Sequence, residues 1–239
     1  MCGSCHTRAF NWVCYACSEK GQNYRFSVLV GTIFENTKYA LREWFRVIHM
    51  MLTAKKGIRA LQIHRTIGTG SYRTAWSMCH RIRAALVDTN FRKLMGIVEV
   101  DETYIGGKKH NKHGPHPRKH GPSTKTAVIG AVSRKGSVIA RVLDNVTKEA
   151  MRAFVRETVS TDISLLSTDE HRGYHSLGFE YPHGSVHHAR KQYVVGAIHT
   201  NTIEGFWSLV KRSIVGSYHK VSRKYLPLYI AEAQFKYNA

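Results

Sequence analysis

The chain has 239 residues, of which 43% are hydrophobic, and this is enough for a packed core and excludes a disordered chain. Lysine and arginine number 36 against 16 aspartates and glutamates, so the formal net charge is +20. A charge of this size favours a polyanionic partner such as nucleic acid, because it otherwise only adds self-repulsion to the folded state. The sequence has no run of about 18 apolar residues and no secretory signal pattern, so we expect a cytoplasmic, nucleoid-associated protein.

Four cysteines crowd the start of the chain, at Cys2, Cys5, Cys14 and Cys17. Two pairs, each separated by two residues, have the spacing of two knuckles that present four thiolates to one tetrahedral Zn²⁺ ion. A disulfide framework is not expected in a reducing compartment. The spacing therefore predicts a structural zinc ribbon over residues 1–30.

Residues 31–95 are predicted to form a helical DNA-binding region. The first helix lies in "ENTKYALREWFRVIHMML", with Asn36 as its N-cap. Apolar residues recur there at helical spacing and predict one buried stripe. Its members are Leu41, Trp44, Phe45, Ile48 and Leu52.

Two further helices in this region predict a helix-turn-helix. "GIRALQIHRTIG" forms a short helix that ends at Gly68, and "TGSYRTAWSMCHRIRAALV" a longer one that begins near Ser71. The residues predicted to face inward are Ala75, Met78, Ile82 and Leu86. The residues predicted to be exposed, where they would meet phosphates or base edges, are Arg73, His80, Arg81 and Arg83. An ordinary helical hairpin with a solvated basic face is the alternative.

Composition changes near residue 96, where "GIVEVDETYIGG" alternates with period two and predicts a strand. Glu99 and Asp101 fall on one face of this strand and Glu102 on the other. A carboxylate buried in such a strand needs a cation, a hydrogen-bond network or an exposed edge. We expect Glu102 to pair with a basic residue.

The remaining segments, over residues 96–239, predict an α/β domain. After a basic loop come two hairpin strands in "TAVIGAVSRKGSVIARVLD", a helix in "TKEAMRAFVRETV" and a strand in "SLLSTDEHRGY" that ends at Asp169. This order resembles an RNase H-like domain with a mixed sheet, in which the two strand aspartates are neighbours. A late helix, carrying Glu204, brings a third acid to them. Three carboxylates around one point favour Mg²⁺ ions, two of which promote phosphoryl transfer.

The helix in "HTNTIEGFWSLVKR" allows two readings of Glu204. Asn201 and Glu204 fit a capping box, with Asn201 as the N-cap and Glu204 reaching back. Lys211 lies seven residues after Glu204, within about 20° of the same helix face, which suits a metal followed by a DNA phosphate. The predicted buried stripe of this helix is Ile203, Phe206, Trp207 and Val210.

Three segments, "VDETYIGGK", "STDEHRGY" and "HTNTIEGFWSLVKR", resemble the catalytic blocks of DDE transposases of bacterial insertion sequences. The chain resembles the ISXO-like group (the IS fifteen-ninety-five family) over essentially its whole length, including "KGIRALQIHRTIGTGSYRTAWSMCHRIR". The resemblance implies Asp101, Asp169 and Glu204 as ligands of two Mg²⁺ or Mn²⁺ ions and Lys211 as a phosphate-facing residue. Some members carry asparagine or histidine at the third acidic position, so Asn201 is a competing assignment.

The implied activity is DNA strand cleavage and strand transfer at the ends of the element. The expected partner is double-stranded DNA, at the terminal repeats and at the target site, and we expect a homo-oligomer to assemble on it, with no membrane involved. One alternative is a zinc-ribbon and helix-turn-helix transcription regulator without catalysis, which has no need for the three acids. Another is an RNase H-like nuclease without strand transfer, which only an assay distinguishes.

Overall fold

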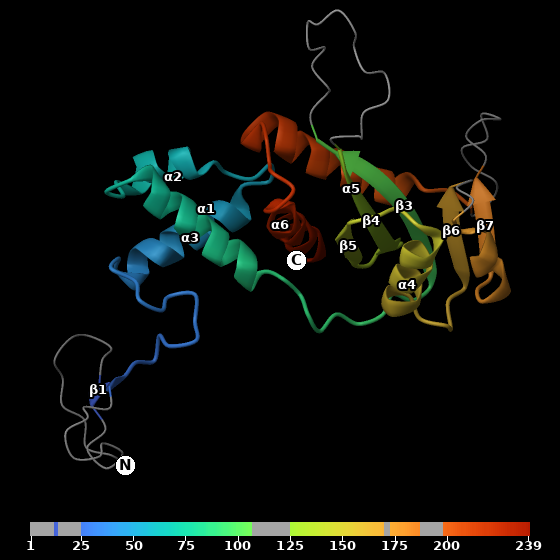
Figure 1. Cartoon of the computed structure of the whole chain (residues 1–239), viewed down its shortest axis with the longest axis horizontal. Helices are drawn as coiled ribbons and strands as arrows, with labels where there is room; N and C mark the ends of the chain where they lie inside the picture. The colour runs from blue at the N-terminus through green and yellow to red at the C-terminus, as the bar shows by residue number, and fades with distance from the viewer. Residues whose placement is uncertain (1–11, 14–24, 107–124, 170–172, 187–197) are drawn as a thin grey trace, which may run out of the picture. The chain divides into compact units, whose positions relative to one another are not determined.

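The structure is a computed structural model that describes residues 12–13, 25–106, 125–169, 173–186 and 198–239. It divides into two compact units, which are Met1–Thr53 with Ala60–Ala85, and Ala54–Arg59 with Leu86–Ala239 (Figure 1). Across the ranges described, no helix is long and apolar enough to cross a membrane.

The smaller unit contains three helices and a two-stranded antiparallel ladder. The strands are β1 (Trp12–Val13) and β2 (Arg25–Phe26), and the helices are α1 (Leu41–Thr53), α2 (Ala60–Ile67) and α3 (Tyr72–Ala85). The predicted end of the second helix at Gly68 and the predicted start of the third near Ser71 are confirmed, but α3 ends at Ala85, before the predicted inward residue Leu86. Gly68, directly after α2, has a φ of 71°, and the Ser71 hydroxyl accepts a hydrogen bond from the Thr74 N–H at 3.2 Å. A left-handed glycine ends one helix and a serine caps the next.

The first helix differs from its prediction. Helix α1 begins at Leu41, and Asn36 has a left-handed φ of 55°, so it is not an N-cap. Its buried residues are Trp44, Val47 and Met51, whereas Phe45 is 58% exposed. The apolar pattern of this segment admits two neighbouring stripes, and packing selects the one centred on Trp44.

The basic residues of α3 are less exposed than predicted. Arg73 is exposed, but His80 and Arg83 are buried, with 9% and 2% of their surface accessible. Arg81 is half-buried and donates a hydrogen bond to the backbone carbonyl of Glu35 at 2.6 Å. Long basic side chains cover apolar surface with their stems, and a three-helix unit uses them in this way. A smaller part of α3 than predicted is therefore open to a ligand.

The larger unit is a mixed α/β structure built on a five-stranded sheet of order β5-β4-β3-β6-β7. The β3–β4 and β4–β5 pairs are antiparallel, and the β3–β6 and β6–β7 pairs are parallel. The predicted strands are present, and β7 is an addition to them. The bounds are β3 (Ile97–Ile105), β4 (Thr126–Ser133), β5 (Val138–Leu143), β6 (Leu165–Asp169) and β7 (His183–Val186).

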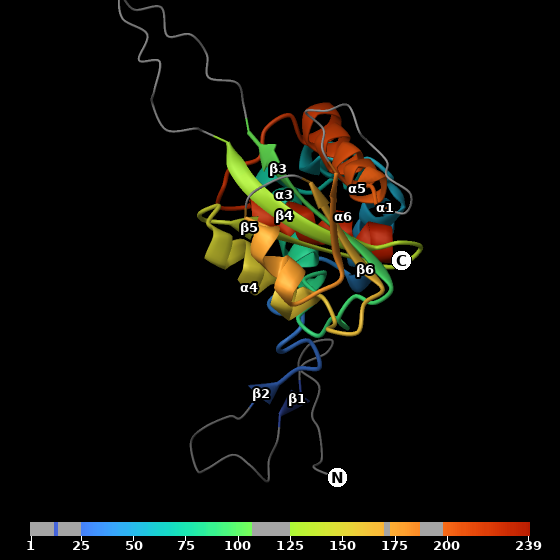
Figure 2. The same cartoon turned by 90° about the vertical axis from the view of Figure 1, so that its right-hand side faces the viewer.

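Helices cover both faces of this sheet (Figure 2). Helix α4 (Lys148–Thr158) packs on one face, while α5 (Asn201–Arg212) and α6 (Leu226–Asn238) pack on the other. A 3₁₀ turn η1 (His175–Phe179) precedes β7, and a π-helical segment η3 (Ser213–Tyr218) continues α5. The core under α4 includes Val98, Val100, Ile129, Met151, Phe154, Val155 and Leu166. The core under α5 and α6 includes Val128, Val132, Ile203, Phe206, Trp207, Val210 and Ile230.

The alternation of β3 decides which carboxylates meet α5. Val98 and Val100 point into the core under α4, so Glu99 and Asp101 lie on the opposite face, toward α5. The buried stripe predicted for α5 is confirmed, and α4 buries Met151, Phe154 and Val155. Each side of the sheet is thus closed by a helix that the sequence pattern identifies.

Candidate metal centre

Asp101 and Asp169 lie side by side on neighbouring strands. The parallel register of β3 and β6 pairs Val100 with Thr168, and one further step along both strands places Asp101 next to Asp169. Asp169 is the last residue of β6, where the strand ends at the edge of the sheet. The structure therefore brings the two strand aspartates together, as the order of the segments predicted.

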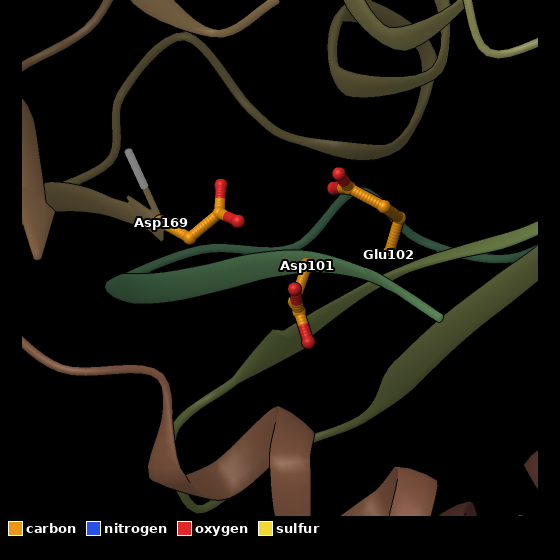
Figure 3. Close-up of side chains that lie close together, drawn as sticks. All are labelled: Asp101, Glu102 and Asp169. Atoms are coloured by element: carbon orange, nitrogen blue, oxygen red, sulfur yellow. The ribbon is translucent and has the colours of Figure 1, made fainter. Parts of the chain in front are cut away.

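A third carboxylate, that of Glu102, joins them. Oxygens of Asp101, Glu102 and Asp169 lie within 4.8 Å of one another. Figure 3 shows Asp101 and Glu102 leaving opposite faces of the strand, while the longer Glu102 side chain turns toward Asp169. The hydroxyl of Tyr174, which is fully buried, donates a hydrogen bond to Glu102 Oε2 at 2.8 Å.

The sequence predicted a basic partner for Glu102, and the structure places its carboxylate beside those of Asp101 and Asp169. The prediction relied on strand alternation, which describes the direction of Cα–Cβ bonds but not where the end of a long glutamate side chain lies. Tyr174 lies 72 residues further along the chain, so the sequence carried no local signal for this hydrogen bond.

The electrostatics of the cluster fit a divalent cation. Burial first, and then the charges of Glu102, Asp169 and, least of all, Glu204 together raise the pKa of Asp101 from 3.8 to about 7, against a hydrogen bond from the Glu102 backbone that lowers it. Burial and the charges of Glu102, Asp169 and Asp101 raise the pKa of Tyr174 well above its ordinary value, so its hydroxyl keeps its proton. A cation would relieve this repulsion, and carboxylate oxygens are the ligands that Mg²⁺ and Mn²⁺ prefer.

Helix α5 is attached to the cluster through Trp207. Its indole Nε1–H donates a hydrogen bond to Asp101 Oδ2 at 3.1 Å. Gly130, the β4 partner of Asp101, leaves the space for this ring, since a Cβ at that position would lie 2.7 Å from the Trp207 Cζ2 atom. Glycine at this point lets α5 pack close to the sheet.

Glu204 lies one helical turn before Trp207 and is exposed. Its Oε1 atom accepts a hydrogen bond from the Thr200 hydroxyl at 2.9 Å. Among the residues placed by the structure, it lies outside the 4.8 Å cluster, but its charge contributes to the raised pKa of Asp101. Lys211, in the last turn of the same helix, is also exposed.

The predicted capping box with Asn201 as the N-cap is wrong. Asn201 is the first residue of α5 and is exposed, and the N-cap is Thr200. Thr200 makes no side-chain cap hydrogen bond to any residue in the described part of the chain. The backbone N–H groups of Thr202 and Ile203 donate instead to Glu99 Oε2, at 2.8 and 3.1 Å. A distant carboxylate replaces the local cap, and no pattern within the helix could indicate this.

The predicted zinc ligands lie in a part of the chain that the structure does not describe. Cys2, Cys5, Cys14 and Cys17 lie outside the described residues, as does nearly all of the basic loop before β4. The zinc ribbon stays a prediction.

Comparisons with known proteins identify the family to which this chain belongs. Residues 93–238 match the family model of the ISXO2-like transposase domain. A protein from Halobacterium salinarum described as an uncharacterized protein in transposable element ISH50 is 26% identical over 224 residues, which cover 88% of this chain and 74% of that protein.

Two solved structures show a weaker similarity. The Mos1 strand transfer complex and a pre-cleavage Mos1 transpososome have TM-scores of 0.26 and 0.23, at 9% identity. The alignments cover 84% of this chain and 76% and 78% of those chains. TM-scores this low do not establish a common fold. The family match, in contrast, spans more than half of the sequence. This chain therefore belongs to the ISXO2-like transposase family, whose members are enzymes that act on DNA.

Proposed function

We propose that residues 96–239 form an RNase H-like catalytic domain that cleaves and transfers DNA strands at the ends of an insertion sequence. The adjacency of Asp101 and Asp169 on parallel strands, beneath the helix that carries Glu204, is the observation that supports this most. The strand order of the sheet is compatible with it, because β3 and β6, which carry one aspartate each, are neighbours.

In this proposal Asp101, Asp169 and Glu204 hold divalent cations, Mg²⁺ or Mn²⁺, and Glu102 lies beside them. Two such ions, when bound, activate an attacking oxygen and stabilise the leaving one. The chain itself orients the ligands, since Trp207 occupies one oxygen of Asp101 and Tyr174 one oxygen of Glu102. These two fixed donors direct the remaining oxygens of both carboxylates toward the shared space.

The chain also supplies positive charge for the DNA. Lys211 and Arg212 are exposed in the last turn of α5, beyond Glu204 on the same helix. We assign Lys211 to a phosphate of the bound strand. In cleavage, water attacks a phosphodiester at the end of the element, and its P–O3′ bond breaks to release a 3′-hydroxyl. In transfer, this hydroxyl attacks a phosphodiester of the target, whose P–O3′ bond breaks in turn and releases the 3′-hydroxyl of the target strand.

The N-terminal parts complete the proposal. Residues 1–30 form a zinc ribbon held by Cys2, Cys5, Cys14 and Cys17, and residues 31–95 contact the terminal repeats and target DNA through α2 and α3. Copies of the chain assemble on this DNA. Elemental analysis should find one zinc per chain, and a zinc-free protein whose Cys2→Ser and Cys14→Ser variants fold unchanged would contradict the ribbon.

The test uses linear DNA that carries the inverted repeats flanking the gene. We expect Mg²⁺-dependent cleavage and strand joining by the parent chain, and neither reaction by Asp101→Asn, Asp169→Asn or Glu204→Gln. Combinations should be no worse than single variants, because the three acids act as one site. Glu157→Gln on α4 removes an exposed ion pair with Arg141 of β5, and this variant serves as the control and should react normally.

Two outcomes would change the proposal. Glu204→Gln should keep its melting temperature, since glutamine can still accept the Thr200 hydroxyl. Near-normal cleavage by this variant, with an inactive Asn201→Ala, would move the third ligand to Asn201. Cleavage without strand joining would leave a nuclease of the same fold.

A further inference from the structure

Glu99 is a fully buried carboxylate that the proposed chemistry does not use. It has 0% of its surface exposed and lies two residues before Asp101, on the same face of β3. Its two oxygens accept four hydrogen bonds. The donors are Arg134 Nε at 2.6 Å, the Thr202 N–H at 2.8 Å, the Thr202 hydroxyl at 2.9 Å and the Ile203 N–H at 3.1 Å.

Burying a carboxylate such as that of Glu99 costs free energy of folding, so its presence suggests a specific structural role. An ionised carboxylate at this depth needs an opposite charge and several hydrogen bonds to offset its loss of hydration. Arg134 supplies the charge, and the first turn of α5 supplies three of the bonds. Serine, threonine or asparagine at the N-cap would satisfy the same helix N–H groups on the surface at lower cost. The buried arrangement therefore does more than cap a helix.

What it adds is a fixed position for the start of α5 on the sheet. The residue before the N-cap, His199, is held as well, because its carbonyl accepts hydrogen bonds from Arg134 Nη2 at 3.1 Å and from Ser167 Oγ at 2.7 Å. The His199 Nδ1 atom lies 3.2 Å from Glu99 Oε1 but outside hydrogen-bond geometry. Three strands thus contribute to one anchor, since Glu99 is on β3, Ser167 is on β6 and Arg134 follows β4.

The residues of this anchor are close in sequence to the proposed metal ligands, both on β3 and on α5. Asp101 follows Glu99 by two residues along β3, a distance of about 6.6 Å, and Glu204 follows the bonded Ile203 by one residue along α5. The anchor and the Trp207–Asp101 hydrogen bond are two separate attachments of α5 to β3, and Glu204 lies between them along the helix.

We infer that Glu99 is a positioning residue, which holds the first turn of α5 so that Glu204 shares a divalent cation with Asp101 and Asp169. The inference rests on the proposed function, because it assumes that Glu204 is a ligand. It assigns no chemistry to Glu99 itself, whose oxygens are occupied by the chain.

The test measures Mn²⁺ binding to the full-length, DNA-free protein by electron paramagnetic resonance, with Asp101→Asn as the background. Glu99→Gln keeps the shape of the side chain but loses the charge that faces Arg134. We expect it to weaken Mn²⁺ binding by about tenfold or more, as substitutions of residues that orient metal ligands do. Glu232→Gln is the matched control, since Glu232 is also buried (3% exposed) and bonded to Lys236 and Tyr218, but on α6. It should bind Mn²⁺ as the parent does, even if its melting temperature falls.

A double variant separates positioning from general stability. If Glu99 acts through Glu204, adding Glu99→Gln to Glu204→Gln should weaken Mn²⁺ binding no further. A further loss in the double variant, or an equal loss in Glu232→Gln, would overturn the inference.

A milder change covers the case in which Glu99→Gln does not fold. Thr202→Val removes one donor to Glu99 and keeps the branched shape, and we expect a smaller loss of Mn²⁺ affinity. Parental affinity in Thr202→Val and in any folded Glu99→Gln would overturn the inference while leaving the proposed function intact. Parental affinity in Glu204→Gln would instead contradict Glu204 as a ligand, and the inference would fall with it.

Discussion

The ionisation of Asp101 depends strongly on its surroundings. Its pKa is about 7 in the folded chain, against an ordinary value of 3.8, chiefly because of burial and the neighbouring carboxylates. Between these two values the folded protein keeps a proton that the unfolded chain has lost. The contribution of this group to stability is therefore most favourable below about pH 4 and is lost as the pH rises toward 7.

We predict that added Mg²⁺ or Mn²⁺ stabilises the protein more at pH 8 than at pH 6. At pH 6 the cation has to displace a proton from Asp101, whereas at pH 8 the carboxylate is already ionised and strained by its neighbours. Thermal unfolding of Mg²⁺-free protein with and without added cation, at both values, measures the difference. Asp101→Asn should show no such dependence on pH. Equal shifts at the two values in the parent chain would contradict the prediction.

For Glu102, the local sequence pattern predicts the face of the strand but not the position of the carboxylate. The alternation of residues 97–105 correctly placed it on the face opposite Asp101, as Figure 3 shows. Its carboxylate nevertheless joins Asp169, because the side chain is long enough to turn at the sheet edge and Tyr174 holds it there. A tyrosine far along the chain decides the position of the carboxylate.

Between elements, the contact of β4 with α5 is the closest approach near the cluster. Gly130 lies in the middle of β4, and an added Cβ would be 2.7 and 2.8 Å from two atoms of the Trp207 ring and 3.2 Å from the Ile203 Cδ1 atom. In a packed core, contacts this short are relieved only when a whole side chain, here the Trp207 ring, moves. The spacing of α5 from the sheet therefore depends on glycine at this position.

We predict that Gly130→Ala lowers the free energy of unfolding by about 1–3 kcal/mol and displaces Trp207 from Asp101. Urea unfolding measures the stability, and Mn²⁺ binding at a temperature where the variant is folded measures the displacement. Gly205→Ala is the control for stability, since the structure describes no atom within 4 Å of an added Cβ there. Alanine in that helical position should raise stability by about 0.5–1 kcal/mol. An unchanged Gly130→Ala would show that the ring has room to move.

The start of α5 gives the second element-level prediction. Asn201→Ala should change the free energy of unfolding by less than about 0.5 kcal/mol, as for other exposed positions without a structural role, because Thr200 and Glu99 occupy the capping positions. Urea unfolding of this variant beside the parent measures it. A loss near 1 kcal/mol, the usual effect of a removed N-cap, would show that Asn201 caps the helix after all.

For the whole molecule, the net charge of +20 is the dominant property. We predict that DNA binding in metal-free buffer survives Asp101→Asn and weakens steeply as salt rises. Contacts to phosphates release counterions, so the logarithm of the affinity should fall linearly with that of the salt concentration. Fluorescence anisotropy over about 50–200 mM salt measures the slope. An affinity independent of salt, or a loss of binding in Asp101→Asn, would contradict this division between binding and catalysis.

The sequence by itself determined most of the elements and the inward faces of β3 and α5. The alternation of β3, the stop at Gly68 and the buried stripe of α5 depend on interactions between residues close along the chain, and periodicity and turn chemistry report those directly. Tertiary structure decided which elements meet. It selected the Trp44 stripe of α1, buried His80 and Arg83, brought Tyr174 to Glu102 and replaced a local cap of α5 by Glu99. Each of these outcomes depends on how separate elements pack together, and a pattern within one element cannot specify its partner in another.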